Sequence, residues 1–396
     1  MTLTYDNDTI HSRRSAWGAV FSMTLCVFVL IASEFMPVSL LTPIAADLGV
    51  SEGNTGQAIS ISGIFAVFTS LFIAGLTRRL DRRVVVLALT ILLMLSGVVV
   101  TFAPSYPILM LGRGLLGVSI GGFWSMSTSI VMRLVTTDQV PKALALLNAG
   151  NAIAATISAP LGSLLGSYIG WRGAFFLVVP VGLLALVWQW ISLPTLPPRS
   201  DRAGLNVFRL LLRPPVALGM AAILLLFMGQ FALFTYLRPF MEQVTHLGIE
   251  TLSLALLLMG LAGAVGTWVV SRLLKHRLFS ILIAIPFLMA CIAMAMIALG
   301  DKQVPVFMSL VAWGFFATAA PVGWGTWLSR ILADDAEAGG GLQVAVIQLA
   351  ITAGASLGGL LFDAAGWQST FVLSAALLCG SSLTAIAAWR ATRRLS

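Results

Sequence analysis

Charged residues are scarce in this sequence. Only 10% of its 396 residues are Asp, Glu, Lys or Arg, whereas 59% are hydrophobic and the mean hydropathy is +0.98. In an ordinary soluble domain about a quarter of the residues are charged. The composition therefore excludes such a domain and predicts an all-α integral membrane protein, because helices satisfy their own backbone groups inside a bilayer.

Cysteine and histidine are also rare. The three cysteines, Cys26, Cys291 and Cys379, fall within apolar segments, so we expect neither a disulfide framework nor a metal site. The three histidines fall in the N-terminal tail or in loops, which argues against a histidine proton relay inside the membrane. A Walker loop and a nucleophile elbow are lacking too. We predict no enzymatic activity, no cofactor and no nucleotide hydrolysis.

Long apolar runs, in contrast, fill most of the chain. Each contains about 20 residues or more, enough to cross roughly 30 Å of hydrocarbon as a helix. The twelve predicted crossings are residues 17–43, 53–77, 83–103, 107–132, 143–168, 174–193, 216–238, 251–271, 278–299, 305–328, 342–362 and 370–390.

The basic residues indicate how these helices are oriented. If the N-terminus lies inside, 19 of the 23 Lys and Arg residues fall on the cytoplasmic side, as the positive-inside rule requires. We therefore expect both termini to be cytoplasmic. The net charge of +8 is explained by membrane topology, and no nucleic-acid partner is expected.

A charged, proline-containing segment divides the chain into two similar parts. The predicted organisation is a cytoplasmic tail at 1–16, a six-helix bundle at 17–193, a cytoplasmic linker at 194–215, a second six-helix bundle at 216–390 and a tail at 391–396. The segment "PLGSLLGSYIGWRGAFFL" (160–177) matches "SLGGLLFDAAGWQSTFVL" (356–373), which aligns the Gly-Trp pair at 170–171 with the pair at 366–367. Such a repeat indicates a transporter with two pseudo-symmetric halves around a midplane site.

Four segments carry motifs. They are "EFMPVSLLTPIAADLGVSEG" in the first predicted helix, "GLTRRLDRRVVVL" (75–87) after the second, "LGRGLLGVSIGG" (111–122) in the fourth and "GNAIAATISAPLGSLLG" (150–166) in the fifth. They resemble the major facilitator superfamily, specifically its twelve-helix drug:proton antiporter branch. The resemblance implies the fold of that family, alternating access and a monomer in the cell membrane.

The resemblance also implies roles for particular residues. Arg113 stands at the charged position of the fourth-helix motif, and Pro160 and Gly162 stand in the antiporter motif of the fifth helix. In the loop at 75–87 it implies conformational roles for Gly75, Asp81 and Arg82. This loop departs from the family pattern, because an arginine occupies position 79 where aspartate is expected. Asp81 is the candidate substitute.

Other stretches are more specific. "GGFWSMSTSIVMRLV", "FRLLLRPP", "GQFALFTYLRPF" and "PVGWGTWLSRILADDAEAGGGLQVAVIQLA" resemble the bacterial purine ribonucleoside efflux pumps. This resemblance implies export of purine ribonucleosides such as inosine and guanosine, driven by proton entry across the bacterial inner membrane. The implied partners are a small-molecule substrate, protons and the lipid bilayer.

Glu34 is the only acidic residue that falls well inside a predicted helix. A carboxylate in hydrocarbon is costly unless it faces a protein interior or a water-filled cavity. It is therefore the candidate proton carrier, with Arg113 as its mobile counter-charge. The alternatives are a permanently neutral glutamate that donates one structural hydrogen bond, and an arginine that binds helix carbonyls.

Polar and aromatic residues follow helical spacing on the helices that line the cavity in the family. Aromatic faces suit a flat purine ring, and amides can recognise its polar edge. The predicted substrate-binding residues are Gln230, Trp124, Asn148, Asn151, Phe234, Trp324, Gln343, Gln348 and Arg238. For any single aromatic residue the alternative is packing or a lipid-facing belt, and for Arg238 it is snorkelling towards the membrane surface.

Three other functions remain compatible with the residues. The first is proton-coupled efflux of sugars or drugs by the same fold. The second is uncoupled transport, in which Glu34 is structural. The third is a membrane receptor or scaffold that binds a ligand without moving it.

Overall fold

The computed structural model describes residues 16–198, 207–332 and 336–393, and every regular element in these ranges is a helix. The N-terminal half contains α1 (Trp17–Leu48), α2 (Glu52–Leu76), α3 (Arg82–Thr101), α4 (Tyr106–Leu134), η1 (Thr137–Gln139), α5 (Val140–Phe176) and α6 (Val178–Ser192). The C-terminal half contains η2 (Val207–Leu212), α7 (Pro214–Phe234), α8 (Leu237–Gln243), α9 (Ile249–Leu299), α10 (Gln303–Ala317), α11 (Ala319–Ile331), α12 (Ala336–Ala365) and α13 (Trp367–Arg393).

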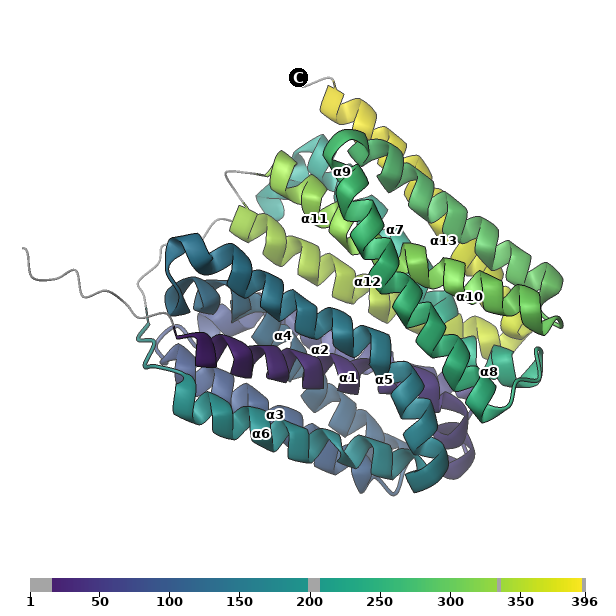
Figure 1. The fold of residues 1–396 in the computed structure, drawn as a ribbon, viewed down its shortest axis with the longest axis horizontal. Helices are drawn as coiled ribbons and strands as arrows, with labels where there is room; N and C mark the ends of the chain where they lie inside the picture. Colours follow the sequence, from purple (N-terminus) through teal and green to yellow (C-terminus); the bar gives the residue numbers. More distant parts are fainter. Residues whose placement is uncertain (1–15, 199–206, 333–335, 394–396) are drawn as a thin grey trace, which may run out of the picture.

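The two halves lie side by side, and each has its own hydrophobic core (Figure 1). One buried cluster is made only of residues between Ala19 and Leu196. The other is made of residues from the C-terminal half, joined by Val38, Ile59 and Ala159 from the first. The helices that bring the halves together are α2 with α12 and α5 with α9.

Eleven helical stretches within the described ranges are long and apolar enough to cross a membrane. The prediction of an all-α membrane protein is thus confirmed. The number differs from the twelve predicted crossings because the 51 residues of Lys142–Ser192 form one stretch. That stretch contains a non-helical residue, Gly170, with φ 72° and ψ 164°.

The two glycines of the predicted repeat share one unusual conformation. Gly170 has φ 72° and Gly366 has φ 77°, a left-handed region that side chains with a Cβ disfavour. Each Gly-Trp pair therefore begins with a glycine of positive φ.

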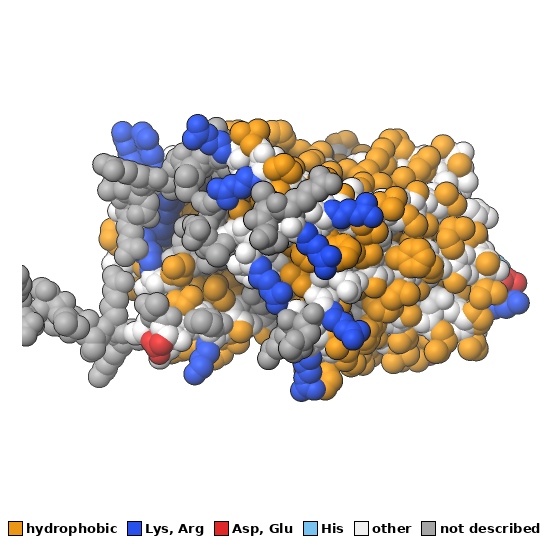
Figure 2. Space-filling view, turned by 90° about the horizontal axis from the view of Figure 1, so that it is seen from above, with side chains coloured by type: hydrophobic (Ala, Val, Ile, Leu, Met, Phe, Trp, Pro, Cys, Tyr) orange, Lys and Arg blue, Asp and Glu red, His pale blue; other side chains and the backbone are white. Residues whose placement is uncertain are grey.

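The two ends of the bundle differ in charge. We call the end where α1 begins at Trp17 and α13 ends at Arg393 the terminus side, and the end where the chain turns at Gly49, Gly170 and Gly366 the opposite side. In Figure 2, basic side chains gather over one part of the visible face, whereas hydrophobic and other uncharged groups cover most of the described surface beside it. Such an apolar belt suits contact with lipid.

Candidate functional site

Glu34 lies at the boundary between the halves. It belongs to the distal part of α1 and is only 3% exposed. Its carboxylate oxygen Oε1 accepts a hydrogen bond from Nε2 of Gln348 on α12, at 3.5 Å. This amide is also buried. This hydrogen bond of the buried carboxylate therefore crosses from one half to the other.

The neighbouring proline explains how Arg113 is held. Pro37 has no N–H, so the carbonyl of Ser33, four residues earlier in α1, loses its helical partner. Nη1 of Arg113 donates to this Ser33 oxygen at 2.6 Å, and Nη2 donates to the backbone oxygen of Glu34 at 3.0 Å. A guanidinium thus replaces the hydrogen bond that the proline removes.

Arg113 also binds the second helix of its half. Its Nε donates to the backbone oxygen of Ala58 at 3.0 Å and Nη2 donates to Oγ of Ser62 at 3.3 Å, both on α2. Arg113 is completely buried, and within the described residues it forms no ion pair with the Glu34 carboxylate. This arrangement matches the alternative in which the arginine binds helix carbonyls.

Arg238 repeats the same chemistry between the halves. Pro43 frees the carbonyl of Ser39 in α1, and Nη1 of Arg238 on α8 donates to that oxygen. The guanidinium also forms an ion pair with Glu242 at 2.8 Å. Arg238 is buried rather than extended towards the membrane surface, so it links the halves instead of snorkelling.

On the opposite side, α2 and α12 are joined by further polar contacts. The Asp363 carboxylate at the end of α12 accepts hydrogen bonds from Oγ of Ser51 at 2.5 Å and from the backbone N–H of Gly53 at 3.1 Å. These groups form the N-terminus of α2, where the helix dipole favours a negative charge. Asp363 therefore acts as an anionic cap from the other half.

Two further layers of contacts lie nearer Glu34. Oγ of Ser356 donates to Oε1 of Gln57 at 2.9 Å, and Nε2 of Gln57 donates to the backbone oxygen of Ser356 at 3.3 Å. Oγ of Ser60 donates to the backbone oxygen of Thr352 at 3.2 Å. We call the contacts of Asp363, Ser356, Thr352 and Gln348 with the N-terminal half the α2–α12 seam, although its last member reaches α1.

An aromatic cluster lies beside Glu34. The ring of Phe35 stacks on Phe231 with centroids 5.7 Å apart, and both contact Phe234 edge-on at 6.4 and 5.8 Å. Gln230 lies on α7, one turn before Phe234. Its Oε1 is buried and has no hydrogen-bond partner among the described residues. A buried acceptor without a partner needs an explanation, and a ligand donor is one.

The remaining predicted binding residues are not gathered around this cluster by any described contact. Trp324 is buried in the C-terminal core, edge-on to Trp327 at 5.4 Å. Asn148 is exposed and donates to the backbone oxygen of Leu144 in its own helix. The others, Trp124, Asn151 and Gln343, are half-buried.

The loop before α3 is tied to its own half. Oδ1 of Asp81 accepts hydrogen bonds from the backbone N–H of Arg83 at 2.8 Å and of Leu196 at 2.9 Å, so it caps α3 and holds the chain after α6. Nη1 of Arg82 donates to Oγ1 of Thr77 at 2.6 Å. At Gly75 an added Cβ would meet no atom within 4 Å, so packing does not require glycine there.

The antiporter-motif residues in α5 allow close helix contact. Pro160 is buried within the helix, and a Cβ at Gly162 would meet Oγ of Ser39 and the side chain of Met36 on α1. Gly162 therefore lets α5 approach α1 beside the carbonyl that Arg238 binds.

The sequence reasoning missed several residues of this site. Phe35 and Phe231 were hidden among many apolar residues, and Thr352 and Ser356 carry no motif. Two signals were available: Asp363 lies just before the repeated Gly-Trp pair, and a proline within a helix always frees the carbonyl four residues earlier.

Comparisons with known proteins agree with this architecture. The family model of the Major Facilitator Superfamily matches residues 23–340. The chain belongs to this superfamily of transporters and not to a family of enzymes. A crystal structure of a bacterial homolog of the human lysosomal transporter Spinster, inward-facing and unoccupied, covers 95% of this chain and 97% of its own with a TM-score of 0.77 and 16% identity.

Two curated relatives are much more similar in sequence. The chain is 45% identical over 370 residues to the purine ribonucleoside efflux pump NepI of Escherichia coli, which covers 93% of each protein. It is 53% identical over 367 residues to a protein named transcription regulatory protein OpdE of Pseudomonas aeruginosa, with 92% of this chain and 91% of the relative covered.

Proposed function

We propose that this protein exports purine ribonucleosides, such as inosine and guanosine, in exchange for protons. The similarity to the purine ribonucleoside efflux pump, 45% over 93% of both chains, supports the substrate class. The observation that carries the proton coupling is Glu34, a buried carboxylate whose side chain contacts the other half. A group in that position changes its surroundings whenever the halves separate.

The topology that this function requires is twelve crossings with both termini in the cytoplasm. The stretch Lys142–Ser192 would be about 76 Å long as one straight helix, more than twice the thickness of roughly 30 Å that a crossing needs. The turn at Gly170 supports two crossings there. The terminus side then faces the cytoplasm, and the matching turns at Gly170 and Gly366 support two pseudo-symmetric bundles.

Glu34 is suited to connect protonation with movement because it takes part in two kinds of contact. Its backbone oxygen is held by Arg113 within the N-terminal half, while its side chain reaches Gln348 in the C-terminal half. When the α2–α12 seam opens, the amide leaves and water reaches the carboxylate from outside. A proton taken up there is carried to the cytoplasmic side when the seam closes again.

We place the nucleoside beside the aromatic cluster of Phe35, Phe231 and Phe234. A purine stacked on one of these rings would bring its N–H donors within reach of the partnerless Oε1 of Gln230. Base–aromatic stacking contributes roughly 1–3 kcal/mol per base in nucleic-acid complexes. Gln348, also predicted to bind substrate, lies at the same boundary, next to the carboxylate.

Counterflow of radiolabelled inosine in proteoliposomes tests the substrate assignment. Gln230→Ala should raise the KM for inosine about fivefold, because one hydrogen bond to the base is lost. Gln303→Ala, which changes an exposed glutamine at the start of α10, should leave the KM unchanged. Counterflow of sugars or unrelated drugs in the absence of inosine and guanosine counterflow would instead support the alternative substrates.

The name of the Pseudomonas aeruginosa relative raises a second candidate, an effect on transcription. An exporter lowers the internal concentration of its substrate, so it can alter transcription without binding nucleic acid. A purified system distinguishes the two functions, because inosine counterflow by the protein alone, without a regulator or DNA, would show transport activity of its own.

A further inference from the structure

A pocket lies far along the chain from Glu34, on the terminus side of the C-terminal half. Its volume is about 520 Å³, and it forms where α9 is broken at Arg277, which has φ −134° and ψ 41°. The ends of α11 and α13 complete its walls. None of the residues of the candidate transport site lines it.

The pocket is lined by three arginines, each from a different helix, and by no acidic residue. Nη2 of Arg330 donates to the backbone oxygen of Leu274 at 3.2 Å, which anchors one side of the guanidinium. The guanidinium of Arg393 lies 4.3 Å from the ring centroid of Trp389. Arg277 is exposed and has no hydrogen bond or ion pair among the described residues. The described lining therefore carries three guanidinium groups and no carboxylate.

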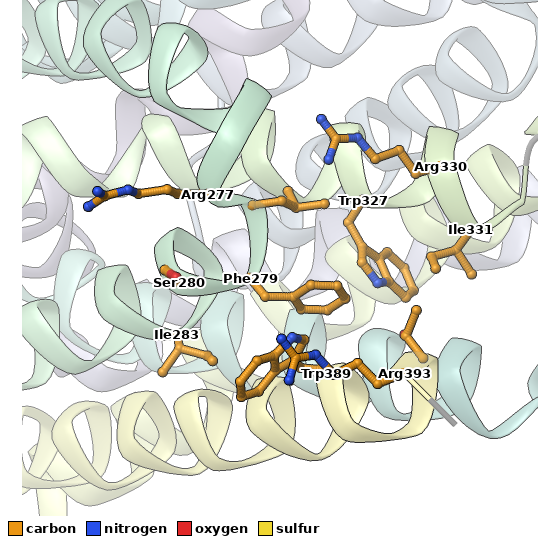
Figure 3. Close-up of a pocket in the computed structure, with 11 residues that line it drawn as sticks. Arg277, Phe279, Ser280, Ile283, Trp327, Arg330, Ile331, Trp389 and Arg393 are labelled. Atoms are coloured by element: carbon orange, nitrogen blue, oxygen red, sulfur yellow. The ribbon is translucent and has the colours of Figure 1, made fainter. Parts of the chain in front are cut away.

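The centre of the pocket is aromatic. Figure 3 shows Phe279, Trp327 and Trp389 grouped together, with Arg277 and Arg330 extending from the helices around them. The indole N–H of Trp327 is buried and lacks a hydrogen-bond partner among the residues described. The pocket thus combines apolar walls, an unused donor and a cationic rim.

This combination fits a molecule with an anionic head and an apolar body. Arginine binds phosphate through paired N–H groups, and tryptophan prefers the level of the lipid headgroups. Basic pockets between membrane helices bind anionic headgroups in this way. We propose that the pocket binds the phosphate of an anionic phospholipid from the leaflet on the terminus side.

Native mass spectrometry of the purified full chain, mixed with phosphatidylglycerol and phosphatidylcholine, tests this site. The parent protein should retain the anionic lipid in preference to the zwitterionic one. In the double variant Arg277→Gln/Arg393→Gln, the ratio of bound anionic to bound zwitterionic lipid should be about tenfold lower, because charge-assisted hydrogen bonds to phosphate are removed. If that variant cannot be purified in a folded state, Arg277→Gln alone should lower the same ratio about threefold.

The matched control is Arg272→Gln/Arg390→Gln. It likewise removes one positive charge from α9 and one from α13, but neither residue lines the pocket. The preference for the anionic lipid should therefore persist. Equal preferences in the two double variants, or no preference in the parent, would overturn the proposal. Displacement of the lipid by millimolar glycerol 3-phosphate in the parent, but not in the pocket variant, would assign the same phosphate site to a soluble ligand.

Discussion

The interior of the N-terminal half and the α2–α12 seam hold polar groups in different ways. Inside the half, one buried arginine binds three backbone oxygens and a hydroxyl on α1 and α2. Across the seam, single hydroxyl, amide and carboxylate groups meet in separate layers. The first arrangement is costly to break, whereas the second can be opened one layer at a time.

In the proposed transport cycle, this difference separates the parts expected to move from those expected to stay together. In alternating access each half moves largely as a rigid body, and the contacts between the halves exchange. Arg113 makes the N-terminal half rigid at the level of Glu34. The polar contacts between the halves lie on the opposite side or near the midplane, so the described structure is closed on the opposite side.

The largest effect should come from Arg113→Leu. It leaves the Ser33 oxygen without a donor and removes the bonds of the guanidinium to two further backbone oxygens and the Ser62 hydroxyl, which should lower the free energy of unfolding by about 3–5 kcal/mol. Arg113→Lys should restore less than half of this loss, because one ammonium cannot reach all four acceptors. Thermal unfolding of the purified protein measures both variants.

Arg78→Leu is the control for this prediction. Arg78 is exposed, on the terminus side of the same half, so the unfolding midpoint should change little. A midpoint for Arg113→Leu equal to that of the control would show that the carbonyl contacts are dispensable.

A smaller effect on folding, but a large one on transport, is expected from Gly359→Leu. A Cβ at Gly359 would meet the backbone oxygen of Gly53 at 2.7 Å and the Tyr236 hydroxyl. The larger side chain should hold the seam apart and lower the rate of uphill inosine export more than tenfold. Gly341→Leu, on the same helix but with no atom within 4 Å of its Cβ position, should export at the parent rate.

If Gly359→Leu exports as fast as Gly341→Leu, the seam is not needed for the cycle. The comparison between a rigid half and an opening seam would then fail.

The smallest effect should come from Asp363→Asn. This change weakens an exposed charge–dipole contact at the N-terminus of α2, a contact of roughly 0.3–1 kcal/mol. The seam should open about two- to fivefold more often. A cysteine introduced at Thr352, which is buried here, should then react two- to fivefold faster with an impermeant maleimide added from outside.

The control for this labelling is Asp301→Asn, at an exposed acid outside the seam. Its labelling rate should equal that of the Thr352→Cys parent. Equal labelling rates for both asparagine variants would show that the Asp363 carboxylate does not hold the seam closed.

Glu34 and Arg113 could be found from the sequence because charged residues in apolar runs are rare and therefore conspicuous. The helical fold and the family followed from composition, long apolar runs and motifs. The partners of Arg113 could not be found by the same route, since they are backbone oxygens that no residue type reveals. Helical spacing also could not separate a binding face from core packing, as Trp324 against Trp327 illustrates.

The number of membrane crossings also differs between the prediction from hydropathy and the structure. Hydropathy predicts two crossings between residues 143 and 193, whereas the structure gives Lys142–Ser192 as one apolar stretch that is interrupted at Gly170. The distinction depends on Gly170, whose left-handed conformation is a local feature that hydropathy does not detect.

The proton role of Glu34 is the central claim, and Glu34→Gln tests it most directly. Glutamine keeps the shape of the protonated acid and its contact with Gln348 but cannot release a proton. In proteoliposomes the variant should exchange inosine at close to the parent rate, yet a pH gradient should drive no accumulation. Glu250→Gln, at an exposed acid on α9, should accumulate inosine as the parent does. Accumulation by Glu34→Gln equal to that of the parent would contradict the claim and make the buried carboxyl a structural group.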